Sequence, residues 1–205
     1  GADAATDGTT DQIGCDPPLP VLPGGIEPLR TVTGYDHGGG VSGDMGVIHH
    51  EAFVVDGEGG YTLLSFQDFR GPEAARAAGS CVVWTDPECG DPGPDPPCED
   101  QETIPVDSYV DLPVAVLFLV GCPYESMGGC ERQFMAVSGK ATFTAFDKPE
   151  DSWHLDTLER LGLRLESLVF REVQIDPVSF GSTFTCANCS QSFTFAPYEF
   201  DYTAP

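Results

Sequence analysis

The sequence predicts an all-β protein, an antiparallel β-sandwich or flattened barrel that is disulfide-stapled and carries one short helix. Runs of β-branched and aromatic residues recur along the chain, and several alternate with polar residues. The 24 glycines and 18 prolines are scattered without a repeat, which is typical of many turns between short strands. Eight cysteines, most of them beside turn-forming residues, favour cross-links in the loops.

The chain divides into an arm and a domain. Residues 1–28 show no helical or strand period, and their five prolines predict an extended, Pro-rich N-terminal arm. A small, acidic opening of this kind is expected after processing of an exported precursor. Residues 29–205 are predicted to form a single β domain with a Cys/Pro/Asp-rich loop at 86–100, where five prolines exclude regular structure. That loop would equally suit a boundary between two halves.

The first half of the domain is predicted to hold strands and the helix. Leu29–Tyr35 is the first strand signal. Val47–Val55 and Tyr61–Phe66 are joined by a glycine-rich turn, so they predict a β-hairpin. Residues 71–79 are the clearest helix, because they are rich in alanine, carry a proline near the start and end on glycine. A further short strand is expected at Cys81–Trp84.

The second half of the domain is more clearly β. Val114–Val120 is uniformly apolar, as a buried central strand would be. Gln133–Val137 and Lys140–Phe146 flank Ser138-Gly139, a pair that predicts a tight hairpin.

The strongest alternation of apolar and polar residues in the chain lies at Leu161–Ile175, and it predicts a long strand. Leucines at helical spacing also allow a helix at Leu155–Leu168, but Gly162 and the following β-branched residues favour the strand. The chain ends in three further strand signals, whose alternating phenylalanine and threonine residues suit a half-buried hairpin: Ser182–Thr185 and Gln191–Phe195, followed by Tyr198–Tyr202. About nine to twelve strands are expected in all.

The charge of the chain limits its partners. Thirty-three acids against nine bases give a formal charge of −24, which disfavours nucleic acid and anionic membrane surfaces as partners. No apolar run reaches the roughly 18–20 residues that span a bilayer, so no transmembrane segment is expected. The acids serve either solubility at a cell exterior or the binding of a divalent cation.

Calcium is the metal that the acidic loop would suit best. Calcium takes six to eight oxygen ligands from flexible loops, although no D-x-D-x-D-G pattern is present. The alternative is that these acids are simply solvated. The candidate calcium ligands lie within fifteen residues: Asp86, Glu88, Asp91, Asp95, Glu99 and Asp100.

The four histidines offer a less favoured site for copper or zinc, since imidazole is a common ligand of transition metals. His49 and His50 are adjacent, so on a strand their side chains would point to opposite faces. A site would have to combine one of them with His37 or His154. The competing interpretation is that all four are surface or structural histidines.

The cysteines predict disulfides and therefore an oxidising compartment. A local pairing is expected, in which each cysteine bonds to a near neighbour and the remaining two pin the arm to the domain. The Cys186–Cys189 motif is interpreted as a structural disulfide, with half a zinc site and a redox pair as alternatives. The expected pairs are Cys15–Cys81, Cys89–Cys98, Cys122–Cys130 and Cys186–Cys189.

Two stretches carry a resemblance to a known group of proteins. The segments at Gly139–Asp147 and Leu165–Asp176, together with the Cys-Gly-Asp-Pro sequence at 89–92, resemble stretches from uncharacterised exported proteins and lipoproteins of myxobacteria. The resemblance implies a location at the exterior, cell surface or periplasm of a Gram-negative bacterium. It implies no activity and no catalytic residues.

The sequence favours a non-enzymatic extracellular or cell-envelope protein with a structural, assembly or adhesive role. No G-x-S-x-G elbow or H-E-x-x-H motif is present. The expected partners are other protein subunits, of the same or another kind, which would pair with exposed edge strands. The alternative is an exported metal-binding protein, and a secreted hydrolase of unrecognised type is a third hypothesis.

Overall fold

The structure is a computed structural model, and the strands predicted from the sequence form most of it. It describes residues 30–37, 46–55, 60–70, 74, 76–86, 98–123, 129–147, 158–185, 193–194 and 197–203. The predicted arm at 1–28 and most of the loop at 86–100 lie outside these residues. Within the part of the chain that is described, no helix has the length and apolarity needed to cross a membrane.

The described elements are one short 3-10 helix and eleven strands. In chain order they are β1 (Arg30–His37), β2 (Gly46–Val55), β3 (Tyr61–Asp68), β4 (Ser80–Thr85), β5 (Glu99–Pro105), η1 (Tyr109–Asp111), β6 (Val114–Cys122), β7 (Arg132–Asp147), β8 (Arg160–Ile175), β9 (Ser182–Phe184), β10 (Phe193–Thr194) and β11 (Tyr198–Thr203).

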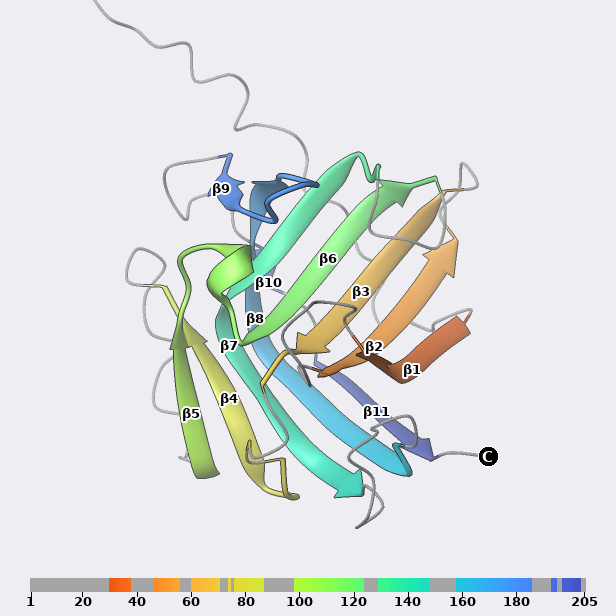
Figure 1. The fold of residues 1–205 in the computed structure, drawn as a ribbon, viewed down its shortest axis with the longest axis vertical. Helices are drawn as coiled ribbons and strands as arrows, with labels where there is room; N and C mark the ends of the chain where they lie inside the picture. The colour runs from red at the N-terminus through yellow and green to blue at the C-terminus, as the bar shows by residue number, and fades with distance from the viewer. Residues whose placement is uncertain are drawn as a thin grey trace, which may run out of the picture.

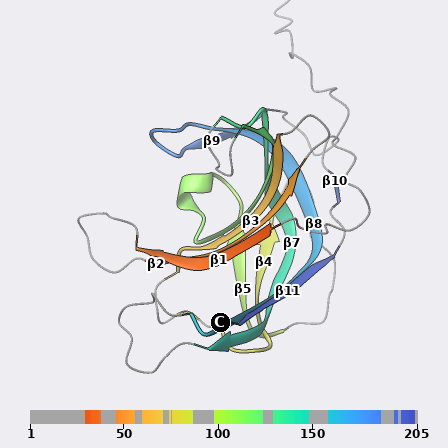
Figure 2. The same ribbon diagram turned by 90° about the vertical axis from the view of Figure 1, so that its right-hand side faces the viewer.

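The strands form one sheet that branches at β7. The first half of β7 pairs with β6, and the sheet continues through β3 and β2 to β1. The second half of the same edge of β7 pairs with β4, beyond which lies β5. The opposite edge of β7 pairs with β8 along its length. Figures 1 and 2 show the result, in which the two branches cross as the layers of a sandwich.

The predicted hairpin at Ser138-Gly139 is wrong, because β7 passes through these residues without turning. Its register with β8 shifts on both sides of Ser138, which marks a bulge. Gly139 has a φ of +124°, and a Cβ there would lie 2.8 Å from the Leu168 Cα. Glycine is therefore required by a bend that carries one strand from the first layer into the second.

The helix predicted at 71–79 is also wrong. The described residues of this stretch form bends and a turn that leads into β4. Two helical turns are too short to be stable without packing, and the buried side chain of Arg76 binds Asp68 instead. The short helix of the described chain is η1, which the sequence did not indicate.

The sequence pattern did not predict β5, which pairs in parallel with β4. Its residues are mostly acids and polar side chains, and Ile104 is the buried apolar member. Acidic side chains and Pro105 at this sheet edge hinder pairing with another strand. The β2–β3 hairpin and the strand at β8, by contrast, are confirmed.

The predicted C-terminal hairpin is wrong, because β9, β10 and β11 each pair with the outer edge of β8. Val173 lies opposite Phe184 and Phe170 lies opposite Phe193. These two pairs are three residues apart along β8 but nine residues apart along the chain that returns beside it. The returning chain therefore has six extra residues between β9 and β10. Cys186 and Cys189 lie between β9 and β10 in the sequence, outside the described residues.

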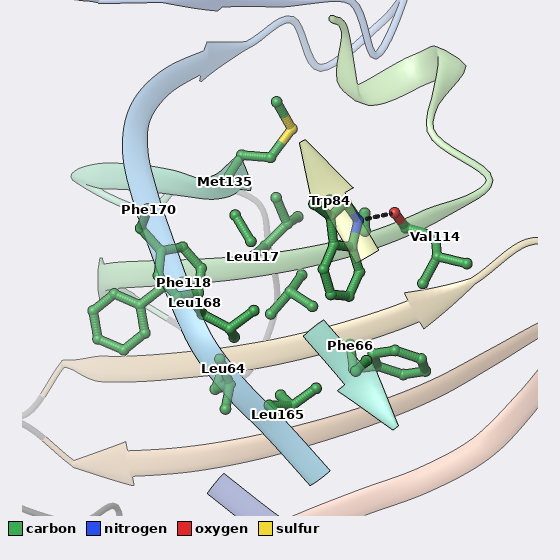
Figure 3. Packing of buried hydrophobic residues seen from close by; sticks show 14 of the residues in the cluster. Leu64, Phe66, Trp84, Val114, Leu117, Phe118, Met135, Leu165, Leu168 and Phe170 are labelled. Atoms are coloured by element: carbon green, nitrogen blue, oxygen red, sulfur yellow. Dashed lines mark hydrogen bonds between the residues drawn. The ribbon is translucent and has the colours of Figure 1, made fainter. Parts of the chain in front are cut away.

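The core lies between the two layers (Figure 3). Aromatic pairs cross it: Phe66 of β3 meets Phe143 of β7 edge-on, and Phe118 of β6 meets Phe170 of β8. The indole Nε1 of Trp84 donates a hydrogen bond of 2.8 Å to the Val114 carbonyl oxygen. The predicted central strand is confirmed, because residues 114–119 of β6 are buried on both faces.

Candidate recognition face beside a cavity

The loop between β8 and β9, residues 176–181, is held rigidly by its own hydrogen bonds. One carboxylate oxygen of Asp176 accepts from the backbone N–H groups of Val178 and Ser179, at 3.0 and 2.6 Å. The backbone of Asp176 also bonds to Phe180 and Gly181. Hydrogen bonds from the backbone and hydroxyl of Ser179 and from the backbone of Val178 lower the pKa of Asp176. The carboxylate therefore stays ionised, and keeps these hydrogen bonds, at a pH where an ordinary aspartate begins to be protonated.

This rigid loop presents apolar side chains to solvent. Val178 is 86% exposed and Phe180 is 53% exposed, and Val110 in η1 is 54% exposed. Phe180 has a φ of +58°, a backbone conformation that costs an aromatic residue energy. The positive φ of Phe180 and the exposure of these apolar side chains make the loop a candidate binding surface.

The short helix η1 is fixed against the loop. The Tyr109 backbone N–H donates to the Ser182 hydroxyl at 2.8 Å, and the Ser182 N–H donates to the Ser108 hydroxyl at 3.2 Å. The Tyr109 hydroxyl donates to Gln67 Oε1 at 2.6 Å. Burial raises the pKa of Tyr109 to about 12, so this hydroxyl remains a donor at neutral pH.

A cavity of about 330 Å³ lies between η1, the loop and the sheet. Its floor includes Leu117 and Leu119 of β6 and Gln133 of β7. Its lining is mostly apolar and consists of Tyr109, Leu117, Leu119, Gly129, Cys130, Gln133, Ile175, Pro177 and Phe180. We call this cavity, together with Val110, Val178 and Phe180, the recognition face.

Gln133 is the residue of the described cavity lining that carries a side-chain amide. Its Oε1 accepts a hydrogen bond of 3.2 Å from the Ile175 backbone N–H, which fixes the orientation of the amide. Its Nε2 group contacts no acceptor among the described residues, although it carries two donors. The cavity therefore offers apolar surface and an N–H donor to a bound group.

The disulfides differ in part from the expected pairing. The Cys122–Cys130 bond is confirmed, and it holds Cys130 at the cavity wall. Cys81 bonds to Cys98, so the predicted Cys15–Cys81 and Cys89–Cys98 pairs are wrong. The reason is the parallel pairing of β4 with β5, which places both cysteines at the same end of the two strands. The remaining candidates, Cys15, Cys89, Cys186 and Cys189, lie outside the described residues.

The structure separates the acids of the predicted calcium loop. The parallel register places Asp86 after the end of β4 and Asp100 at the start of β5, roughly 18 Å apart by strand rise. Asp86 is buried and binds Arg171 Nη1 at 2.7 Å, whereas Asp100 is exposed. The side chain of Glu99 is not described, and Glu88, Asp91 and Asp95 lie outside the described residues. No cluster of three metal-ligating side chains occurs among the residues described, and calcium binding stays a prediction.

The two neighbouring histidines point to opposite faces, as predicted. His50 is 2% exposed and stacks on the Phe200 ring, with Nε2 lying 3.1 Å from the Tyr198 hydroxyl. Burial, and then the charge of nearby His49, lower the pKa of His50 to about 3, so it is neutral in the core. His49 is half-buried. The side chain of His37 is not described, and His154 lies outside the described residues.

Four charged side chains, three of them buried, form a cluster away from the cavity. Asp68 is fully buried and accepts hydrogen bonds from Arg70 and Arg76, and Arg70 also binds Glu102 of β5 at 2.6 Å. Burial alone would raise the pKa of Asp68, but the two guanidinium groups outweigh it and lower the pKa. We call these four residues the Asp68 cluster. It ties β3 to the β4–β5 branch.

Sequence reasoning missed the recognition face entirely. The available signal was a valine and a phenylalanine within a short turn segment, between Asp176-Pro177 and Gly181. Comparison of the chain with models of protein families, with curated proteins and with solved structures finds no match. Function must therefore be inferred from the chemistry of this face.

Proposed function

We propose that the chain is an exported, non-enzymatic protein that binds other proteins through the recognition face, in a structural, assembly or adhesive role. The observation that carries this proposal is the rigid display of Val178 and Phe180 beside a mostly apolar cavity. Protein interfaces centre on large apolar side chains that enter well-packed pockets, surrounded by polar groups.

The disulfides support the exported location. Cys81–Cys98 and Cys122–Cys130 join loops and strand ends. Such bonds persist in extracellular and periplasmic compartments.

The lining of the cavity favours binding over catalysis. The Tyr109 hydroxyl is committed to Gln67, and Cys130 is oxidised. What remains is apolar surface and the Gln133 amide, groups that hold and orient a bound side chain. His50, a residue type common in catalysis, is instead buried between the two layers.

The experiment is a binding assay on cell envelopes from the organism that produces the chain. Fluorescently labelled protein is expected to bind these envelopes saturably. The double variant Val178→Ser/Phe180→Gly is expected to lose this binding, whereas Thr183→Ala, at an exposed position on β9 of the same hairpin, should retain it. Binding that is unsaturable, or equal for both variants, would reject the proposal.

A further inference from the structure

We infer that the partner of the recognition face is a positively charged protein segment that inserts one large apolar or aromatic side chain into the cavity. This inference rests on the proposed function and specifies the chemistry of the partner. It follows from three observations: the size and lining of the cavity, the donor of Gln133, and the distribution of charge around the opening.

The cavity has the size of a side-chain pocket. A volume of about 330 Å³ exceeds the roughly 150 Å³ that holds a benzene molecule. It therefore accommodates an aromatic ring together with part of the backbone that carries it. Leu117, Leu119 and Phe180 would contact the faces of such a ring.

The Gln133 amide provides a second contact suited to a peptide. Its Oε1 is already engaged by the Ile175 N–H, so the group available to a partner is the Nε2 donor. A backbone carbonyl oxygen next to the inserted side chain is the complementary acceptor. A partner without an acceptor there would bury this amide unsatisfied, which costs binding free energy.

Exposed acids lie within two residues of the cavity lining in the sequence. Asp107 and Asp111 flank Tyr109, Glu131 follows Cys130, and Asp176 precedes Pro177, and all four are exposed. Arg132 lies beside Gln133 in sequence, but it binds Glu172 in a bidentate pair and lies against the Phe134 ring on the opposite face of the sheet. No lysine or arginine occurs among the described residues that line the cavity.

The basic side chains elsewhere do not offset this charge. The seven lysine and arginine side chains that the structure describes each form an ion pair with an acid, at N–O distances from 2.6 to 3.8 Å. They are Arg70, Arg76, Arg132, Lys140, Arg160, Arg164 and Arg171. The field outside the protein is therefore set by unpaired acids, and it attracts a cationic segment. A second copy of this chain, with a formal charge of −24, would be repelled.

The test uses synthetic peptides as probes. A blocked five-residue peptide with phenylalanine between two pairs of lysines is titrated into the protein by calorimetry and by NMR. It is expected to shift the signals of the Gln133 side-chain amide. Replacing phenylalanine by alanine should weaken binding about tenfold or more. Replacing the lysines by glutamates should abolish binding.

Variants locate the site and the charge effect. Phe180→Gly should weaken binding of the phenylalanine peptide, and Asp107→Asn/Asp111→Asn should weaken it and reduce its dependence on salt. Glu159→Gln removes an exposed charge at the opposite end of β8 and should leave binding unchanged. The double Asn variant changes exposed residues alone, so it keeps the test open if Phe180→Gly fails to fold.

Four results would overturn the inference. They are equal binding of the alanine peptide, binding that leaves the Gln133 signals unmoved, a dimer that Phe180→Gly dissociates, and binding of neutral indole in the cavity with no binding of the peptide. If the peptides fail while labelled protein still binds envelopes through Phe180, the inference falls and the proposed function stands. Loss of both would reject the proposed function as well.

Discussion

The Asp68 cluster and the recognition face treat side chains in opposite ways. In the cluster, a fully buried carboxylate is surrounded by two guanidinium groups and each charge finds a partner. At the face, Val178 and Phe180 are exposed and the Gln133 amide keeps a donor for use by a partner. The comparison teaches that the burial of charge here serves the fold, whereas the exposed apolar groups are not needed by the fold and carry the proposed binding function. Mutations at the two regions should therefore separate stability from binding.

The largest effect is expected from Asp68→Ala. It leaves Arg70 and Arg76 without their shared counter-charge in the interior, which should lower the free energy of unfolding by about 3–5 kcal/mol. Denaturant unfolding measures the loss. Asp201→Ala, which breaks an exposed pair with Arg160, should cost far less. Equal losses for the two variants would contradict a structural role for the cluster.

The next effect concerns pH and His50. The unfolded chain protonates this histidine near pH 6.5, whereas the folded protein does so only near pH 3. Between these values the unfolded state binds more protons, so stability falls as pH falls, by about 1.4 kcal/mol per pH unit from this residue. His50→Gln should flatten the dependence between pH 6.5 and 5. An unchanged slope in unfolding experiments would contradict the buried, neutral histidine.

The smallest effect on stability is expected from Phe180→Gly, at the recognition face. Glycine adopts a φ of +58° without strain, so stability should stay constant or rise by about 1 kcal/mol at most. Phe180→Ala removes the same ring but keeps the strain, and serves as the matched control. Both variants should lose envelope binding while remaining folded. A large loss of stability in Phe180→Gly would show that the ring belongs to the fold.

Local pattern predicted the strands that lie within the sandwich. The alternation of apolar and polar residues at Leu161–Ile175 reflects a strand with one face more buried than the other. The apolar run at Val114–Val120 reflects a strand that is buried on both faces. Each pattern therefore identifies its strand directly. The β2–β3 hairpin follows from its turn. These features depend on residues close together in sequence.

The errors arose where distant contacts decide the structure. Ser138-Gly139 has the composition of a turn, but neighbouring strands on both edges keep β7 extended there. The acids of β5 gave no strand signal, because its pairing with β4 is parallel and non-local. The recognition face combines η1, three strands and residues of two loops, so no single segment could predict it.

The continuity of β7 and β8 has a consequence for how the molecule loses its structure. Because both strands run through the bend, each layer contains half of the same backbone ladder. Neither layer can unfold while the other stays intact, because unfolding of one layer would break the pairing of β7 with β8 that both layers share. Heating should accordingly produce a single all-or-none transition, with calorimetric and van't Hoff enthalpies in agreement.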